Sequence, residues 1–138
     1  MQRAALLFGI VFALVTVLGF IPGITTDYDR LTTFDDVGAK LLGIFGVNVL
    51  ENIVHALYAL AGFAAAASYA ASRVYFIWGG VVYLVVWLYG LVIDLNSSAN
   101  FIGVNAAANW LHFALGAVMI GIGFLLARRV AGTRAATT

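Results

Sequence analysis

Residues 106–127 read AAANWLHFALGAVMIGIGFLLA and contain no Asp, Glu, Lys or Arg. A helix of about 20 apolar residues is long enough to cross the hydrocarbon core of a bilayer. Three further apolar blocks occupy residues 4–21, 46–71 and 75–93. Because a spanning segment must satisfy its own backbone hydrogen bonds, and these blocks lack the alternation of barrel strands, we predict helices. The sequence therefore predicts an all-α integral membrane four-helix bundle that forms one domain over residues 1–138.

The composition also excludes several classes of protein. Of the 138 residues, 64% are hydrophobic and 9% are charged, and the mean hydropathy is +1.04. Soluble domains are nearer ~45–50% apolar, so a soluble globular protein is excluded. The chain has no Cys, which excludes disulfides, thiolate metal sites, cysteine nucleophiles and covalently attached c-type haem. It also has no phosphate-binding glycine loop and no basic stripe, so we predict no nucleic-acid partner.

Two polar loops connect the predicted helices on one side of the membrane. The first loop is predicted over residues 22–45 and begins with Pro22-Gly23, a pair that ends helices. A second helix that included all of the following apolar residues would be too long for the membrane, so we expect a break near Gly43 or Gly46. The second loop is predicted over residues 94–105.

The charged residues separate onto two faces of the predicted bundle. A tight turn is predicted at Ser72-Arg73, on the same side as both ends of the chain. Five arginines and no acid lie on that side, namely Arg3, Arg73, Arg128, Arg129 and Arg134. The acids lie on the other side with Arg30 and Lys40, and they are Asp27, Asp29, Asp35, Asp36, Glu51 and Asp94. Because Lys and Arg collect in cytoplasmic loops, both ends are predicted to be cytoplasmic in a multi-pass protein of the cell (inner or plasma) membrane.

The two histidines of the chain are predicted to lie at the same depth. His55 and His112 stand at similar distances before the arginines that mark the inner face, and their helices run in the same direction. Each follows an asparagine in an Asn-x-x-His pattern, which suggests a duplicated helical hairpin. At their level lies a predicted outer polar cluster made of Glu51, Asn52, Asp94, Asn105 and Asn109. Ionisable residues in membrane helices are costly, so this cluster is the candidate functional site.

Three interpretations of the histidine pair are open. The two side chains could hold a b-type haem between facing helices, with Ala59 and Gly116 leaving room for the porphyrin. They could bind a metal together with Glu51 or Asp94, but no HxxxH or HExxH pattern is present, and no metal ligands are predicted. Each Asn-x-x-His pair could instead hydrogen-bond across helices and hold the outer half of the bundle together. The structural interpretation is favoured.

Several stretches together resemble a known family. They are residues 19–26 (GFIPGITT), 47–55 (VNVLENIVH), 79–83 (GGVVY), and Asn105 with 109–112 (NWLH). Their order and spacing are similar to the small bacterial, mainly actinobacterial, membrane family catalogued as domain of unknown function 4383. The resemblance covers nearly the whole chain and implies four membrane helices with no established activity. In the family pattern a His often stands at the position of Glu51 and an Asp at that of Ala108, which argues against family-wide metal ligands. The positions that match are Asn52, His55, Asn109 and His112.

For function, the sequence favours a non-enzymatic accessory or scaffolding subunit of a membrane complex. Small residues suited to close helix packing and the absence of any complete catalytic motif support this interpretation. Its predicted partners are the lipid bilayer and either other membrane subunits or a second copy of the chain. One alternative is a redox protein with haem b bound by His55 and His112. The other is a binder of a small ligand, quinone or lipid at the outer face. No catalytic residue is predicted.

Overall fold

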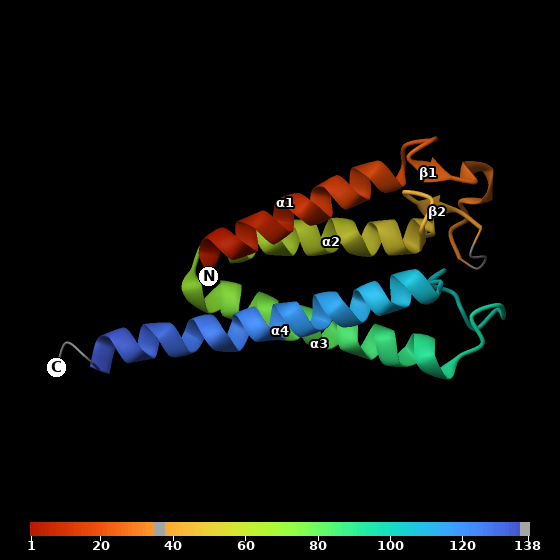
Figure 1. Cartoon of the computed structure of the whole chain (residues 1–138). Coiled ribbons are helices and arrows are strands. Elements are labelled where there is room, and N and C mark those ends of the chain that lie inside the picture. The colour runs from red at the N-terminus through yellow and green to blue at the C-terminus, as the bar shows by residue number, and fades with distance from the viewer. Residues whose placement is uncertain (35–37, 136–138) are drawn as a thin grey trace.

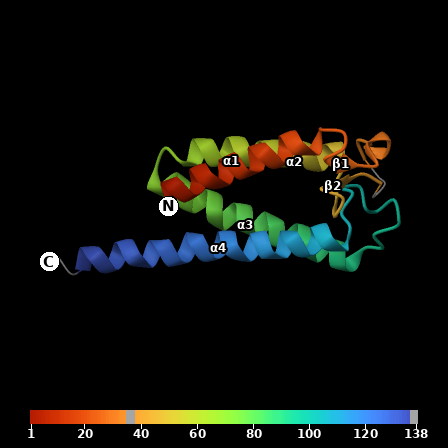
Figure 2. The same cartoon turned by 45° about the horizontal axis from the view of Figure 1, so that its top comes forward.

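The computed structural model describes residues 1–34 and 38–135, with side chains as far as Leu125, and within these ranges four helices form two hairpins (Figure 1). The helices are α1 (Gln2–Gly19), α2 (Val49–Ala65), α3 (Tyr69–Val92) and α4 (Ala106–Ala135). α1 packs mainly on α2, and α3 packs mainly on α4. Figure 2 shows the same arrangement from a second direction, with the α1–α2 and α3–α4 loops at one end of the helices and the α2–α3 turn at the other. The predicted all-α four-helix fold is confirmed.

Three helices in the described part of the chain are long and apolar enough to cross a membrane, by length and composition. They are α1, α3 and the part of α4 from Ala106 to Leu125. α2 is apolar but shorter, with 17 residues. The outward surfaces of the helices carry large exposed apolar side chains, including Leu7, Leu60 and Trp78. Lipid would solvate such surfaces, so the structure supports a membrane protein, while the number of passes and the cytoplasmic ends stay predictions.

The turn between α2 and α3 lies earlier in the chain than predicted. α2 ends at Ala65 and α3 begins at Tyr69, whereas the predicted helices covered residues 46–71 and 75–93. The side-chain oxygen of Ser68 accepts a hydrogen bond of 3.1 Å from the N–H of Ala71 and so caps α3. Ser72, predicted in the turn, lies inside α3 and donates its hydroxyl to the carbonyl of Ala65 at 2.8 Å. The turn is displaced because Ser68 supplies the cap.

The first loop folds into a small three-stranded unit beside the ends of the helices. Its three strands form an antiparallel meander in the order β1 (Thr25–Thr26), β2 (Lys40–Leu41) and β3 (Phe45–Gly46), with a 3-10 turn at Tyr28–Arg30. Leu42 and Gly43 have positive φ between β2 and β3, so the expected break before α2 is confirmed. Asp35 and Asp36 lie outside the described residues, as do the side chains of Arg128, Arg129 and Arg134.

The two hairpins bury corresponding positions. A shift of 71 residues places buried residues of α1 on buried residues of α3, and a shift of 57 residues does the same for α2 and α4. The first set is Ala5, Gly9, Phe12 and Gly19 against Phe76, Gly80, Tyr83 and Gly90. The second set is Glu51, Asn52, His55 and Ala59 against Ala108, Asn109, His112 and Gly116. This pattern supports the hairpin duplication that the repeated Asn-x-x-His motif suggested.

The loop ends of the hairpins are joined by reciprocal hydrogen bonds. Asn48 and Asn105 each accept a backbone N–H three residues later, at 2.9 Å, at the starts of α2 and α4. The amide of Asn48 donates to the carbonyl of Phe101 at 2.9 Å, and the amide of Asn105 donates to the carbonyl of Ile44 at 2.8 Å. Each cap therefore holds the segment that precedes the other helix. These bonds place the first turns of α2 and α4 at the same level.

Candidate functional site

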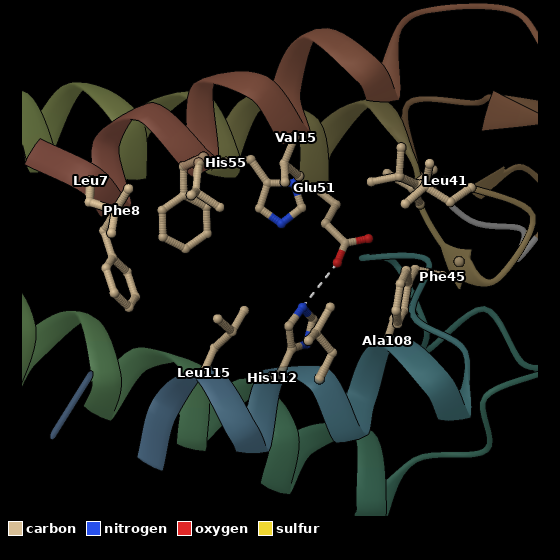
Figure 3. Close-up of a pocket in the computed structure, with 16 residues that line it drawn as sticks. Leu7, Phe8, Val15, Leu41, Phe45, Glu51, His55, Ala108, His112 and Leu115 are labelled. Carbon is tan, nitrogen blue, oxygen red and sulfur yellow. Dashed lines mark ion pairs between the residues drawn. The ribbon is translucent and has the colours of Figure 1, made fainter. Parts of the chain in front are cut away.

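Three buried polar side chains from both hairpins meet between α2 and α4. They are Glu51 and His55 from α2 and His112 from α4, and their exposed fractions are 7%, 9% and 5%. One oxygen or nitrogen atom of each lies within 4.8 Å of the corresponding atoms of the other two. Oε1 of Glu51 lies 3.1 Å from Nε2 of His112 (Figure 3). An acid and two imidazoles thus form a compact group, which we call the polar triad, inside a largely apolar bundle.

The helix caps explain why these side chains meet. His55 stands seven residues after the cap Asn48, and His112 stands seven residues after the cap Asn105. Because the two caps lie at the same level, equal spacing brings both imidazoles to the same depth. Glu51 is four residues before His55, so both point from the same face of α2. The structure brings together Glu51 and both predicted histidines.

Aromatic rings support the two imidazoles in a symmetric way. Phe12 of α1 stacks on His55, with centroids 6.0 Å apart and planes at 23°. Tyr83 of α3, which corresponds to Phe12, packs on His112 with centroids 5.2 Å apart. The rings of Phe12 and Tyr83 themselves stack at 5.9 Å and 11°. Packing on rigid rings restricts the motion of the imidazoles and holds them near Glu51.

Several polar atoms of this region are buried without a hydrogen-bond partner among the described residues. They are Oε2 of Glu51, Nδ1 of His55, Nδ1 of His112 and the hydroxyl of Tyr83. Buried polar side-chain atoms usually have a partner, since an unsatisfied one costs about 1–3 kcal/mol. In a bilayer the surrounding lipid cannot supply one. The polar triad therefore has unused capacity to bind a polar group or a cation.

The asparagines of the predicted outer polar cluster lie behind the triad. Asn52 packs against Gly19 of α1, where a Cβ would lie 2.1 Å from its Oδ1, and both polar atoms of its side-chain amide are without a partner among the described residues. Asn109 packs in the same way against Gly90 of α3 and donates to the carbonyl of Trp87 at 3.2 Å. Asn109 thus makes a hydrogen bond across helices, to α3, whereas the side chain of Asn52 makes none among the described residues.

The other two members of that cluster lie apart from the triad. Asn105 is the cap of α4, and its side chain is used by the bonds described above. Asp94 lies exposed in the second loop, where its carboxylate accepts the N–H of Asn96 at 2.9 Å. Asp94 lines neither of the cavities described below.

A cavity of about 300 Å³ lies between α1 and α4 and reaches the triad (Figure 3). Glu51, His55 and His112 form part of its wall, and the rest of the lining is apolar. The apolar lining comes from three places: Leu7, Phe8, Val11, Phe12 and Val15 of α1; Ala108, Leu111 and Leu115 of α4; and Leu41, Leu42, Phe45, Gly46 and Val47 of the first loop. Sequence reasoning missed this cavity, because the loop residues come close to α4 only in the folded chain.

A smaller cavity of about 60 Å³ lies between α2 and α3 and also reaches the triad. It is the counterpart of the larger one under the same two shifts. Val82, Tyr83, Val86 and Tyr58 replace Val11, Phe12, Val15 and Leu115 in its wall. At the position that corresponds to Ala108 it has Glu51. The larger side chains of Tyr58 and Glu51 fill the space that Leu115 and Ala108 leave open, and Tyr58 is held there by donating its hydroxyl to the carbonyl of Gly79 at 2.8 Å.

A longer repeat in the sequence also indicates the duplication of the site. Gly-Val-Asn occurs at residues 46–48 and again at 103–105, and each copy is followed by the same Asn-x-x-His spacing. Aligning the two copies places Glu51 opposite Ala108, which is where the two cavities differ. A search for internal repeats across the loop and helix together would have found this asymmetry.

A comparison with protein families identifies the chain. The model of the family described as Domain of unknown function (DUF4383) matches residues 2–125. The chain belongs to this family, as its sequence motifs predicted. No curated protein and no solved structure matches it.

Proposed function

We propose that this DUF4383 protein binds a lipophilic small molecule in the cavity between α1 and α4. The observation that carries the proposal is a cavity of about 300 Å³ with apolar walls and the polar triad as its polar group. Ligand pockets are typically about 300–1,000 Å³ and combine mostly apolar walls with a few convergent polar groups. Of the functions considered from the sequence, an outer-face binder of a lipid or quinone fits this arrangement best.

The lining indicates the shape of the ligand. The polar groups of the cavity come from the triad, while the wall along α1 reaches as far as Leu7 and Phe8. A molecule with one oxygen-bearing head and an apolar tail would place the head beside Glu51 and His112. Its tail would lie between α1 and α4, which do not pack closely along their described lengths. With both chain ends in the cytoplasm, as the charge distribution predicts, the head would lie in the outer half of the membrane.

The two other predicted roles receive less support from the geometry. Oε1 of Glu51 lies at hydrogen-bond distance from Nε2 of His112, so a haem iron bound to that nitrogen would meet the carboxylate. Haem ligation through Nε2 of His112 therefore requires Glu51 to move away. The role of accessory subunit stays a prediction. It accounts for neither the buried polar triad nor the cavity beside it, since helix scaffolding requires neither feature.

Photo-labelling with a diazirine fatty acid tests the proposal in purified protein reconstituted into lipid vesicles. Ala108→Leu adds volume to the cavity wall, and we expect it to remove most of the label from α1 and α4. Ala114→Leu is the matched control, because Ala114 is an exposed residue of the same helix and lines neither cavity. Label is located by mass spectrometry of peptides, and circular dichroism checks that both variants are folded.

The distribution of the label separates a bound ligand from the surrounding lipid. A bound molecule predicts label concentrated on the cavity-facing residues of α1 and α4 and saturating with added fatty acid. Equal label on all outward helix faces, unchanged by Ala108→Leu, would mean that the cavity holds no specific ligand and would overturn the proposal.

A further inference from the structure

We infer that the polar triad is a binding site for one divalent first-row transition metal ion, held by Glu51, His55 and His112. Each residue offers one ligand atom, and all three atoms lie within 4.8 Å of one another in the buried interior. The metal does not require the lipophilic ligand, although both would use the same end of the cavity. Metal binding is therefore a separate property of these three side chains.

The distances suit a metal after a small adjustment. Zinc is bound by His nitrogen at about 2.0–2.1 Å and by carboxylate oxygen at about 2.0–2.2 Å, so neighbouring ligand atoms of a tetrahedral ion lie about 3.3 Å apart. Oε1 of Glu51 and Nε2 of His112 are already 3.1 Å apart. The ligand atom of His55 must approach by at most about 1.5 Å, given the 4.8 Å limit, to complete the set. Rotation of a side chain supplies such a movement without a change of the helices.

The charges and the unsatisfied atoms also favour a cation. With both imidazoles neutral, the triad carries one negative charge, which is costly in an apolar interior unless it is neutralised. Oε2 of Glu51 and Nδ1 of His55 have no partner among the described residues, so both atoms are available to an ion. A divalent ion would neutralise the carboxylate and bind one nitrogen of each imidazole. One anionic oxygen group from a ligand or a hydroxide would then leave the whole site neutral.

The donor types indicate which ions the site would select. Imidazole suits zinc, iron, copper and nickel, whereas calcium and magnesium prefer several oxygen ligands. Two histidines and one glutamate are the protein ligands of several mononuclear sites that keep a position open for water or substrate. All three residues line the cavity, so the open position would face it. A lipophilic ligand with an oxygen-bearing head would bind the ion there.

The four-residue spacing of Glu51 and His55 places both side chains on one face of α2, as a metal site on a helix requires. HxxxH and HExxH patterns, which the sequence lacks, place two ligands on one helical face. Glu51 and His55 form an ExxxH pattern with the same four-residue spacing. The third ligand, His112, comes from α4 and stands 57 residues after His55 in the chain, so no local motif contains the complete set.

Cobalt titration tests the metal site directly. The full-length protein is purified in detergent with any histidine tag removed, treated with EDTA, and titrated with CoCl₂ while the visible spectrum is recorded. We expect one cobalt per chain, with absorption bands that disappear on addition of ZnCl₂ and not of MgCl₂. Glu51→Gln and His112→Asn should each weaken cobalt binding by about 100-fold or more, since even residues behind metal ligands change affinity by about 10–100-fold. Asp94→Asn removes a carboxylate from the exposed loop and should leave binding unchanged.

Two further results keep the test decisive. If the Glu51 and His112 variants fail to fold, ZnCl₂ should still raise the thermal unfolding temperature of the EDTA-treated wild type and of Asp94→Asn. No cobalt spectrum and no such rise in a folded wild type would overturn the metal site. Equal binding by wild type and a folded Glu51→Gln variant would also overturn it. Cobalt binding without localised fatty-acid label would refute the proposed ligand alone, and localised label without cobalt binding would refute the metal alone.

Discussion

The α1/α2 and α3/α4 hairpins share a packing scheme but differ where they face each other. They bury corresponding residues, begin their second helices with Asn48 and Asn105, and place one histidine each at the contact. At that contact the first hairpin has Glu51 and Tyr58, and the second has Ala108 and Leu115. The difference leaves one large cavity, one small cavity and one carboxylate. A symmetric scaffold thus carries an asymmetric site.

The single acid has a physical reason. An acid at both positions would direct two carboxylates at the same pair of imidazoles in an apolar interior. Like charges at that distance repel strongly when water is absent. One carboxylate beside two imidazoles avoids this repulsion, and the alanine on the other hairpin leaves the space that becomes the larger cavity. Asymmetry in charge and asymmetry in volume therefore have the same origin.

Exchanging Glu51 and Ala108 between the hairpins gives the strongest test that one carboxylate determines the asymmetry of the site. Glu51→Ala alone should weaken cobalt binding by about 100-fold or more, because it removes a ligand. Adding Ala108→Glu to the same chain should restore most of that affinity, since the new carboxylate would meet His55 as the old one met His112. The fatty-acid label on α1 and α4 should decrease, because the larger side chain at position 108 adds volume to that cavity wall, while Tyr58 still fills part of the smaller cavity. A folded double variant that neither binds cobalt nor loses the label from α1 and α4 would show that the correspondence of the hairpins ends at the site.

A second test addresses the packing inside one hairpin. Gly80→Leu should destabilise the protein by about 1–3 kcal/mol, the usual cost of overpacking, because its Cβ would lie 2.8 Å from the carbonyl oxygen of Gly116. Gly121→Leu is the control, since a Cβ there meets nothing within 4 Å. Unfolding by heat in detergent, followed by circular dichroism, measures the difference. Equal stability of the two variants would contradict the close approach of α3 and α4.

The smallest expected effect is on the free energy of unfolding, when either helix cap, Asn48 or Asn105, is removed. Asn48→Ala should cost about 1–2 kcal/mol, because it removes a helix cap and the bond to Phe101. Asn105→Ala removes the equivalent bonds, but from a more exposed position, so we expect about 1 kcal/mol. Denaturant unfolding of both variants gives the comparison. A larger loss for Asn105→Ala would show that burial does not set the contribution of the cap.

Part of the site was predictable from the sequence. The equal depth of His55 and His112 follows from counting residues along two helices that run the same way, and the structure brings these side chains together with Glu51. Asp94 was assigned to the same polar cluster from its level alone, yet it lies exposed in a loop. The depth of a residue in the membrane can be counted along its helix, but that depth does not show in which direction its side chain points.

The sequence by itself determined the number and class of the helices. Crossing a bilayer constrains the length and apolar character of each helix separately, so each could be recognised from its own residues. The turn between α2 and α3 was misplaced by a few residues, because Ser68 and Ser72 are both able to end or begin a helix. Local chemistry of this kind limits the precision of helix ends without changing the fold.

Only the tertiary structure decided that Glu51 faces His112 and that the larger cavity opens between α1 and α4. A soluble helix shows its inward face as an apolar stripe, whereas a membrane helix is apolar on all sides and carries no such stripe. The meeting of α2, α4 and the β2–β3 segment depends on contacts between residues far apart in the chain, such as Asn105 with Ile44. The positions of such contacts follow from how the hairpins pack, which the pattern of any single helix does not contain.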